Sequence, residues 1–197
     1  MAGIDSNKVY LPTPDQSNTT GAIAVAPVGS TAPTDARTAL AAAFVSGGYV
    51  DENGLSLSLS RSITAIKDWS QATVRKALTE FDGTLSFAFL QIDEFAAKRV
   101  LGSNNVTKTA ATSAHGEELA WKIGAELPDV EAWCFSMKDG NKRVRVFCPC
   151  AQITELSGDI TFVPNAANVW GCTLSTYPDS SGKSIYVFYD DGVVVSV

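Results

Sequence analysis

Two segments with alternating side chains, residues 55–60 and 85–89, stand on either side of a long connection. Leucines alternate with serines in the first segment, and larger apolar residues alternate with small ones in the second. Alternation of this kind is typical of β-strands with one buried face. We expect these side chains to face the core: Leu55, Leu57, Leu59, Leu85, Phe87 and Phe89. The opposite face is small and mostly polar: Ser56, Ser58, Ser60, Ser86 and Ala88.

The connection between these segments, residues 61–73, is unusually apolar for a loop. It carries Ile63, Ile66 and Trp69. Because grouped apolar side chains on a surface mark interaction sites, we predict that the connection contacts a partner. The pattern alone leaves open whether that partner is a substrate, a nucleic acid or another copy of the chain.

Residues 1–30 are rich in Pro, Gly, Ser, Thr and Asn, a composition that cannot build a core by itself. Apolar patches interrupt this segment at Val9, Tyr10 and Leu11, and again at residues 23–25. We expect an extended arm that is either frayed or pinned against a neighbour. Residues 31–197 contain no repeat and no sharp boundary, so we expect them to form a single domain.

Two short helices are predicted in this domain. The first begins at residues 33–35 and ends at the glycines 47 and 48, and the second is capped by Asp93 and ends at Gly102. Their apolar faces comprise Ala36, Ala39, Leu40, Ala43 and Phe44 in the first helix, and Ala97, Val100 and Leu101 in the second.

From residue 104 onward, turn residues recur between short apolar segments, a pattern typical of strands. Asp139 and Gly140 indicate a hairpin turn. The expected strands are 119–123, 131–137, 142–150, 160–163, 169–177, 185–189 and 193–197. The fold class that follows is mainly β: a β-sandwich or flattened barrel of two packed sheets with one or two short flanking helices.

Composition and charge narrow the range of possible functions further. The 197 residues are 45% hydrophobic and 18% charged, which is enough for one substantial core and below the average charge content of about 25%. A net charge of −6 disfavours tight nucleic-acid binding, which needs clustered Lys and Arg. We expect neither a cleaved signal nor membrane insertion, and with four scattered cysteines we expect reduced thiols.

No motif points to catalysis, a cofactor or a metal. His115 lies in a polar turn without a nucleophile elbow, and we interpret it as a solvated loop residue. Residues 148–150 form a C-x-C, which we interpret as buried thiols at a strand end rather than a metal site. The acidic turns at 51–54 and 190–192 lack the spaced ligands of a calcium loop, and glycine motifs for phosphates are missing.

A series of short motifs resembles the major tail proteins, or tail tube subunits, of phages that infect actinobacteria and carry long, flexible, non-contractile tails. The motifs stand in the same order across most of residues 20–192. They are 48–55 (GYVDENGL), 66–69 (IKDW), 78–84 (LTEFDGT), 87–91 (FAFLQ), 137–140 (MKDG), 174–179 (LSTYPD) and 189–192 (YDDG).

The resemblance implies a tail-tube-like β-sandwich that packs into hexameric rings, stacked into a tube through which the genome passes. It implies an interface role for the connection containing Ile66, Asp68 and Trp69 and for the arm before Pro33, and it implies no enzymatic activity. The expected partners are further copies of the chain, the tape-measure, tail-terminator and baseplate proteins, and double-stranded DNA that passes without specific binding. The expected location is the virion tail, assembled in the host cytoplasm.

Two points stay open at this stage. The small polar face of residues 56–60 and 86–88 suits a water-filled bore, but an ordinary solvent-exposed face would have the same pattern. A monomeric β-sandwich that binds carbohydrate or acts in adhesion would instead need an exposed platform of Trp69, Trp121 or Trp170.

Overall fold

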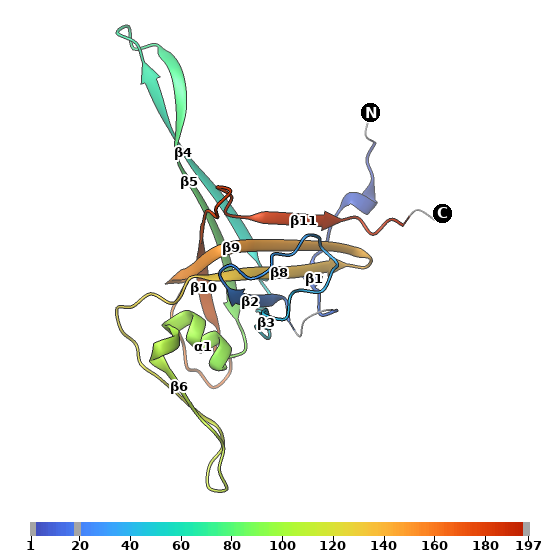
Figure 1. Ribbon diagram of the computed structural model, residues 1–197, viewed down its shortest axis with the longest axis vertical. Coiled ribbons are helices and arrows are strands. Elements are labelled where there is room, and N and C mark those ends of the chain that lie inside the picture. The colour runs from blue at the N-terminus through green and yellow to red at the C-terminus, as the bar shows by residue number, and fades with distance from the viewer. Residues whose placement is uncertain (1–2, 18–20, 195–197) are drawn as a thin grey trace.

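The chain folds around one large antiparallel sheet, shown in the computed structural model of Figure 1, which describes residues 3–17 and 21–194. The strand order is β3-β2-β8-β9-β10-β5-β4, with β1 beside β8 and β11 beside β9, and a separate small sheet pairs β6 with β7. The prediction of a mainly β fold is confirmed. The elements are the 3₁₀ turns Ser6–Lys8 and Ser103–Asn105, the helix α1 (Glu94–Leu101), and the strands β1 (Thr13–Pro14), β2 (Ile23–Pro27), β3 (Val45–Ser46), β4 (Ser56–Lys67), β5 (Thr73–Phe89), β6 (Val106–Thr109), β7 (Glu118–Trp121), β8 (Glu131–Asp139), β9 (Lys142–Leu156), β10 (Trp170–Tyr177) and β11 (Tyr186–Asp190).

The large sheet curls so that two of its inner strands, β5 and β8, face each other. Phe87 on β5 lies 5.8 Å from Trp133 and 5.4 Å from Phe135 on β8, measured between ring centroids, although β9 and β10 separate the two strands within the sheet. The two layers of the predicted sandwich are therefore parts of one folded sheet. The core between them is built mainly from large side chains that are almost fully buried: Ile23, Val25, Leu85, Phe87, Phe89, Trp133, Phe135, Ile153, Trp170 and Leu174.

The helix α1 forms as predicted. The Asp93 carboxylate accepts a hydrogen bond from the Ala96 N–H at 2.9 Å, and the Gly102 N–H donates to the Lys98 carbonyl at 2.9 Å. Gly102 ends the helix with φ 92°, a conformation that favours glycine. Ala97 and Val100 are buried, and Phe95 packs edge-on against Phe89, so the helix covers part of the core.

The helix expected after residues 33–35 does not form, and that prediction is wrong. The Asp35 carboxylate does accept hydrogen bonds from the N–H groups of Arg37 and Thr38, as a helix cap would. However, the buried guanidinium of Arg145 donates to the carbonyls of Asp35 and Thr38 at 2.8 and 2.9 Å. In a helix, those carbonyls would accept hydrogen bonds from N–H groups of the helix itself. Because Arg145 on β9 occupies them, the segment does not form a helix.

Three further expectations about the chain are wrong. Residues 23–27 belong to the core as β2, paired between β3 and β8, so the N-terminal arm is shorter than 30 residues. Residues 160–163 form no strand, and Phe162 is exposed. Residues 193 and 194 are not in a strand either, and 195–197 lie outside the described residues. The hairpin at Asp139 is confirmed, because Asp139 pairs with Lys142 across a two-residue turn.

Candidate assembly surface

The strands β4 and β5 continue together beyond the sheet as a two-stranded ribbon. Their pairing runs from Ser56–Ser86 to Lys67–Thr73, whereas β10 flanks β5 only from Thr84 to Phe89. Figure 1 shows the ribbon, here called the arm (residues 60–82), projecting from the body on the side opposite β6. The predicted long connection at 61–73 is thus mostly strand, and the loop itself spans only 68–72.

One face of the arm continues the face that is buried in the body. Directly opposed residues of an antiparallel pair lie on the same face, and β4 alternates from Leu57 through Leu59 to Ile63. Phe81 on β5 is opposite Arg61, and Leu78 is opposite Ile63, two positions farther along β4. A bulge at Thr79 therefore puts Leu78 and Phe81 on the same face. The apolar side chains of this face are Leu57, Leu59, Ile63, Leu78 and Phe81. Arg61 lies among them, with its guanidinium carbon 5.5 Å from the centre of the Phe81 ring.

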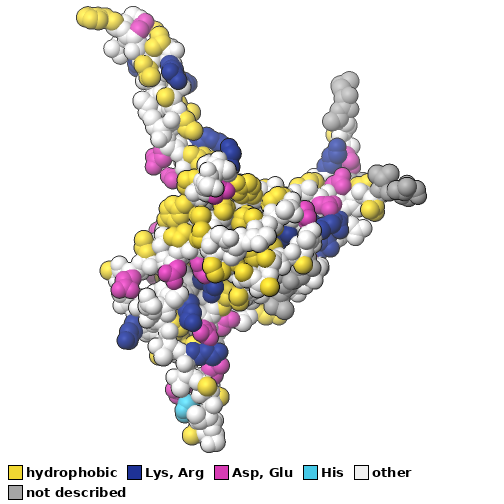
Figure 2. Space-filling model, in the orientation of Figure 1, with side chains coloured by type: hydrophobic (Ala, Val, Ile, Leu, Met, Phe, Trp, Pro, Cys, Tyr) yellow, Lys and Arg dark blue, Asp and Glu magenta, His cyan; other side chains and the backbone are white. Residues whose placement is uncertain are grey.

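This apolar face is uncovered. Leu57 and Leu59 are 39% and 49% exposed, so the prediction that they lie in the core is wrong, whereas it is confirmed for Leu85, Phe87 and Phe89. Leu55 is half-buried against the core. Farther out, Ile63 and Leu78 are each 59% exposed, and Figure 2 shows hydrophobic side chains along the arm. A two-stranded hairpin is at best marginally stable alone, and an exposed apolar strand surface invites another chain.

The tip of the arm is a tight turn built by Asp68. Its carboxylate accepts hydrogen bonds from the Ser70 hydroxyl at 2.7 Å and from the Ala72 N–H at 2.9 Å, and these bonds lower the pKa of Asp68. Gln71 completes the turn with φ 67°. Trp69, between them, is fully exposed. Ile66 is also exposed, but its opposite residue is Arg75 and alternation puts it on the other face from Ile63.

The small polar side chains of the body lie together on the face opposite the core. Ser56 is opposite Ser86 on β5, and Ser86 and Ala88 are opposite Thr173 and Gly171 on β10. Ser58 and Ser60 continue the row along β4 toward the arm, opposite Thr84 and Asp82. Among the described residues paired in this stretch, this face carries hydroxyl groups and one carboxylate but no Lys or Arg.

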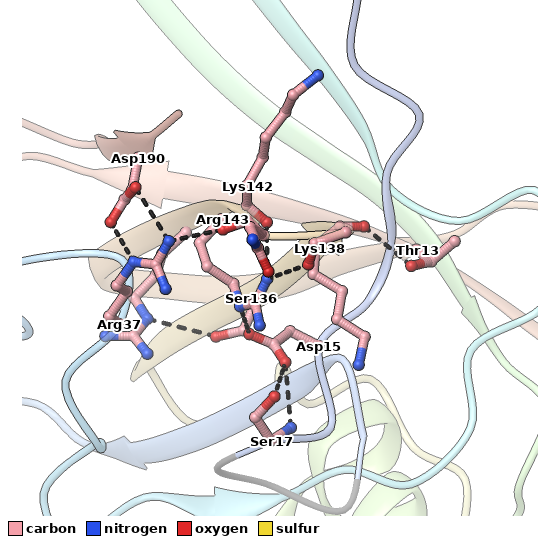
Figure 3. Close-up of polar contacts among 12 residues, drawn as sticks. Thr13, Asp15, Ser17, Arg37, Ser136, Lys138, Lys142, Arg143 and Asp190 are labelled. Carbon is pink, nitrogen blue, oxygen red and sulfur yellow. Dashed lines mark hydrogen bonds and ion pairs between the residues drawn. The ribbon is translucent and has the colours of Figure 1, made fainter. Parts of the chain in front are cut away.

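The N-terminal segment is tied to its own body through Asp15, as Figure 3 shows. The Asp15 N–H donates to the Ser136 carbonyl at 2.9 Å, and its buried carboxylate lies 2.9 Å from Nε of Arg143. Burial raises the pKa of Asp15, but hydrogen bonds from Ser17 and the charge of Arg143 outweigh it, so the pKa is lowered. Nearby, Arg37 forms an ion pair with Asp190.

The three predicted contact residues of this segment differ in their surroundings. Val9 and Leu11 are exposed, whereas Tyr10 is half-buried and packs edge-on against Tyr189, with ring centroids 6.2 Å apart. Part of the N-terminal segment, residues 1–30, which was expected to be extended, is thus held by its own chain at Asp15. The interface role of Val9 and Leu11 stays a prediction.

The residues considered for chemistry are not brought together. His115 lies exposed in the loop after β6, with its Nδ1 2.8 Å from the Gly116 carbonyl and 3.6 Å from the Glu118 carboxylate. Cys148 is buried, which raises the pKa of its thiol to about 12, and Cys150 is half-buried. Within the described residues, no group of three His, Cys, Asp or Glu side chains could hold a metal ion.

The three tryptophans of the alternative binding module form no common platform. Trp170 is buried, Trp121 packs edge-on against it at 5.8 Å, and Trp69 is at the tip of the arm, on the opposite side of the molecule from β7. No described helix is long and apolar enough to span a membrane.

Comparison with known proteins adds one match. The family model described as phage tail tube protein matches residues 16–195, which include the arm, α1 and every strand of the curled sheet except β1. No curated protein matches the chain.

Proposed function

Because the chain belongs to the phage tail tube protein family, we propose that its copies form stacked hexameric rings that make up the tail tube. The observation that carries this proposal is the apolar face of the arm, which continues the core face beyond the body and is left uncovered in a single copy. Contacts between identical chains through two different surfaces generate closed rings or open stacks. A structural role of this kind requires no catalytic residue.

The arm suits a contact between successive rings. Its seven residues from 61 to 67 extend roughly 20 Å past the body at the usual rise per strand residue. An arm of that reach can lie across a neighbouring subunit and bury Ile63, Leu78 and Phe81 there. Val9 and Leu11 of the N-terminal segment are exposed on another part of the surface and supply a second apolar contact.

The small polar face suits the lumen. Ser56, Ser58, Ser60, Ser86 and Ala88 would form a wall of short side chains without cations along these paired strands. Since retention of DNA depends on Lys and Arg that displace counterions from phosphates, such a wall would let DNA slide during ejection. The tube would end at the tail-terminator and baseplate proteins and enclose the tape-measure protein, in the virion tail of a siphovirus of actinobacteria assembled in the host cytoplasm.

Electron microscopy and sedimentation of the purified chain test this proposal. We expect rings or tubes above a threshold concentration, with or without the tape-measure and baseplate proteins as initiators. A variant in which residues 61–81 are replaced by Asn-Gly, joining Ser60 to Asp82, should keep a folded body and form no tubes. A wild-type chain that stays monomeric at every concentration, with those partners present, overturns the proposal.

A further inference from the structure

An apolar pocket opens beside the turn that leads into β4, between the two layers of the curled sheet. Its volume is about 410 Å³, within the range of pockets that bind small ligands, roughly 300–1,000 Å³. The pocket lies between the turn that leads into β4 and the strands β1, β2 and β8. Apolar side chains from both layers line it: Ile23, Val50, Leu55, Phe87, Phe135 and Met137.

The rim of this pocket is acidic. Asp51 and Glu52 belong to its lining, and the residues described along that lining include no Lys or Arg. The Asp51 carboxylate accepts hydrogen bonds from the backbone N–H and the side-chain amide of Asn53, which holds the rim turn in place. The pocket thus offers an apolar floor with carboxylate and amide oxygens at its mouth.

The tip of the arm has the complementary properties. Trp69 is fully exposed at its end, and the Asp68 turn keeps the indole outside the two strands. The ribbon beside it carries Lys67, Arg75 and Lys76 against the single acid Asp68 in residues 67–76. A fully exposed Trp at the end of a projecting ribbon is costly to leave in water, and Trp is enriched among residues that anchor interfaces.

The pocket cannot be filled by the tip of the same chain. The twelve residues of β4 separate the pocket from the tip, and at the usual rise per residue they span roughly 40 Å. Figures 1 and 2 show the arm directed away from the body. The tip and the pocket, at opposite ends of one strand, therefore meet only between two copies, as a head-to-tail contact that repeats from copy to copy.

We propose that Trp69 of one copy inserts into this pocket of a neighbouring copy, with Lys67 against the acidic rim of Asp51 and Glu52. This inference rests on the proposed assembly and specifies its contact. The indole ring packs on the apolar floor, and its N–H faces the oxygen acceptors at the mouth, the usual arrangement for a buried Trp side chain.

Tryptophan fluorescence tests the insertion directly. The emission of Trp69 is obtained by subtracting the spectrum of Trp69→Phe from that of the wild type, in the free chain and in tubes. We expect the Trp69 emission to shift to shorter wavelength on assembly, because the indole leaves water. Tubes in which this emission stays at the wavelength of the free chain overturn the inference and leave the proposed function intact. Failure of the wild type to assemble counts against the proposed function instead.

A charge exchange between exposed residues tests the rim without disturbing the core. We expect Glu52→Lys and Lys67→Glu each to raise the concentration needed for assembly about threefold or more, and the double variant to restore it. We expect Trp69→Ala to raise that concentration about 30-fold, as for an interface anchor. Val74→Ala, an exposed position on the same arm, serves as the control. Additive effects of the two charge variants, without rescue, overturn this pairing.

Discussion

Replacing Ile63 and Leu78 together by Thr should weaken assembly strongly while the monomer stays folded. The two residues are opposite each other on the apolar face of the arm, and each is 59% exposed. Complete burial of such a side chain stabilises by about 1.5–3 kcal/mol, so covering the exposed part is worth about 1–2 kcal/mol for each. Thr is β-branched, which strands favour, but it removes most of this apolar contribution.

The expected loss for the double variant is about 2–3 kcal/mol per contact, which corresponds to roughly 30–150-fold weaker association. Sedimentation over a concentration series measures the threshold for tube formation, and urea denaturation measures the free energy of unfolding. The matched control exchanges a methyl group on the opposite face, with Ser62→Thr and Thr64→Ser together. Tubes of the double variant at the wild-type threshold would refute the assignment of this face, as would an equal loss in the control.

Three other predictions concern the body. Arg145→Met should lower the free energy of unfolding by about 3 kcal/mol, measured with urea, because two partly buried carbonyls lose their charged donor. In the native chain a thiol reagent should label only Cys150, because burial raises the pKa of the other three thiols to about 11 or 12; labelling of a second thiol before unfolding would contradict this. Hydrogen bonds lower the pKa of Asp35 from 3.8 to about 2, so its contribution is present above pH 3.8 and lost as the pH falls toward 2. The difference in urea midpoint between wild type and Asp35→Ala should therefore shrink over that range.

Elements whose signals are local were predictable from the sequence. The α1 helix follows from its Asp93 cap and Gly102 end, and the hairpin at Asp139 follows from its turn residues. Each of these signals acts within a few positions, so distant parts of the fold do not change its meaning. The helix expected after residue 33 had comparable local signals, but Arg145, more than 100 residues away, uses its carbonyls. Nothing near residue 33 could have revealed that donor.

The far half of the arm was missed for a different reason. A β-bulge at Thr79 puts Leu78 and Phe81, three positions apart, on one face, whereas a regular strand would put residues two or four apart there. The alternation that identifies a strand is broken at this point, and the segment after residue 73 shows no period of two. The pairing of Asp15 with Arg143 also escaped prediction, because it joins positions far apart in the chain.

The limit between core and assembly surface is set by β10 rather than by the sequence of β4 and β5. Leu85 is fully buried and Phe81 is 41% exposed, yet both belong to the same face of the same strand. The difference is that β10 flanks β5 only as far as Thr84. Ile185 still lies over Gly83, but farther out no strand of the described residues pairs with β5 other than β4. Apolar alternation reports that a face will be buried, but not by which chain. For a subunit whose sheet extends past its own core, the exposed part of the alternation is therefore the place to look for another copy.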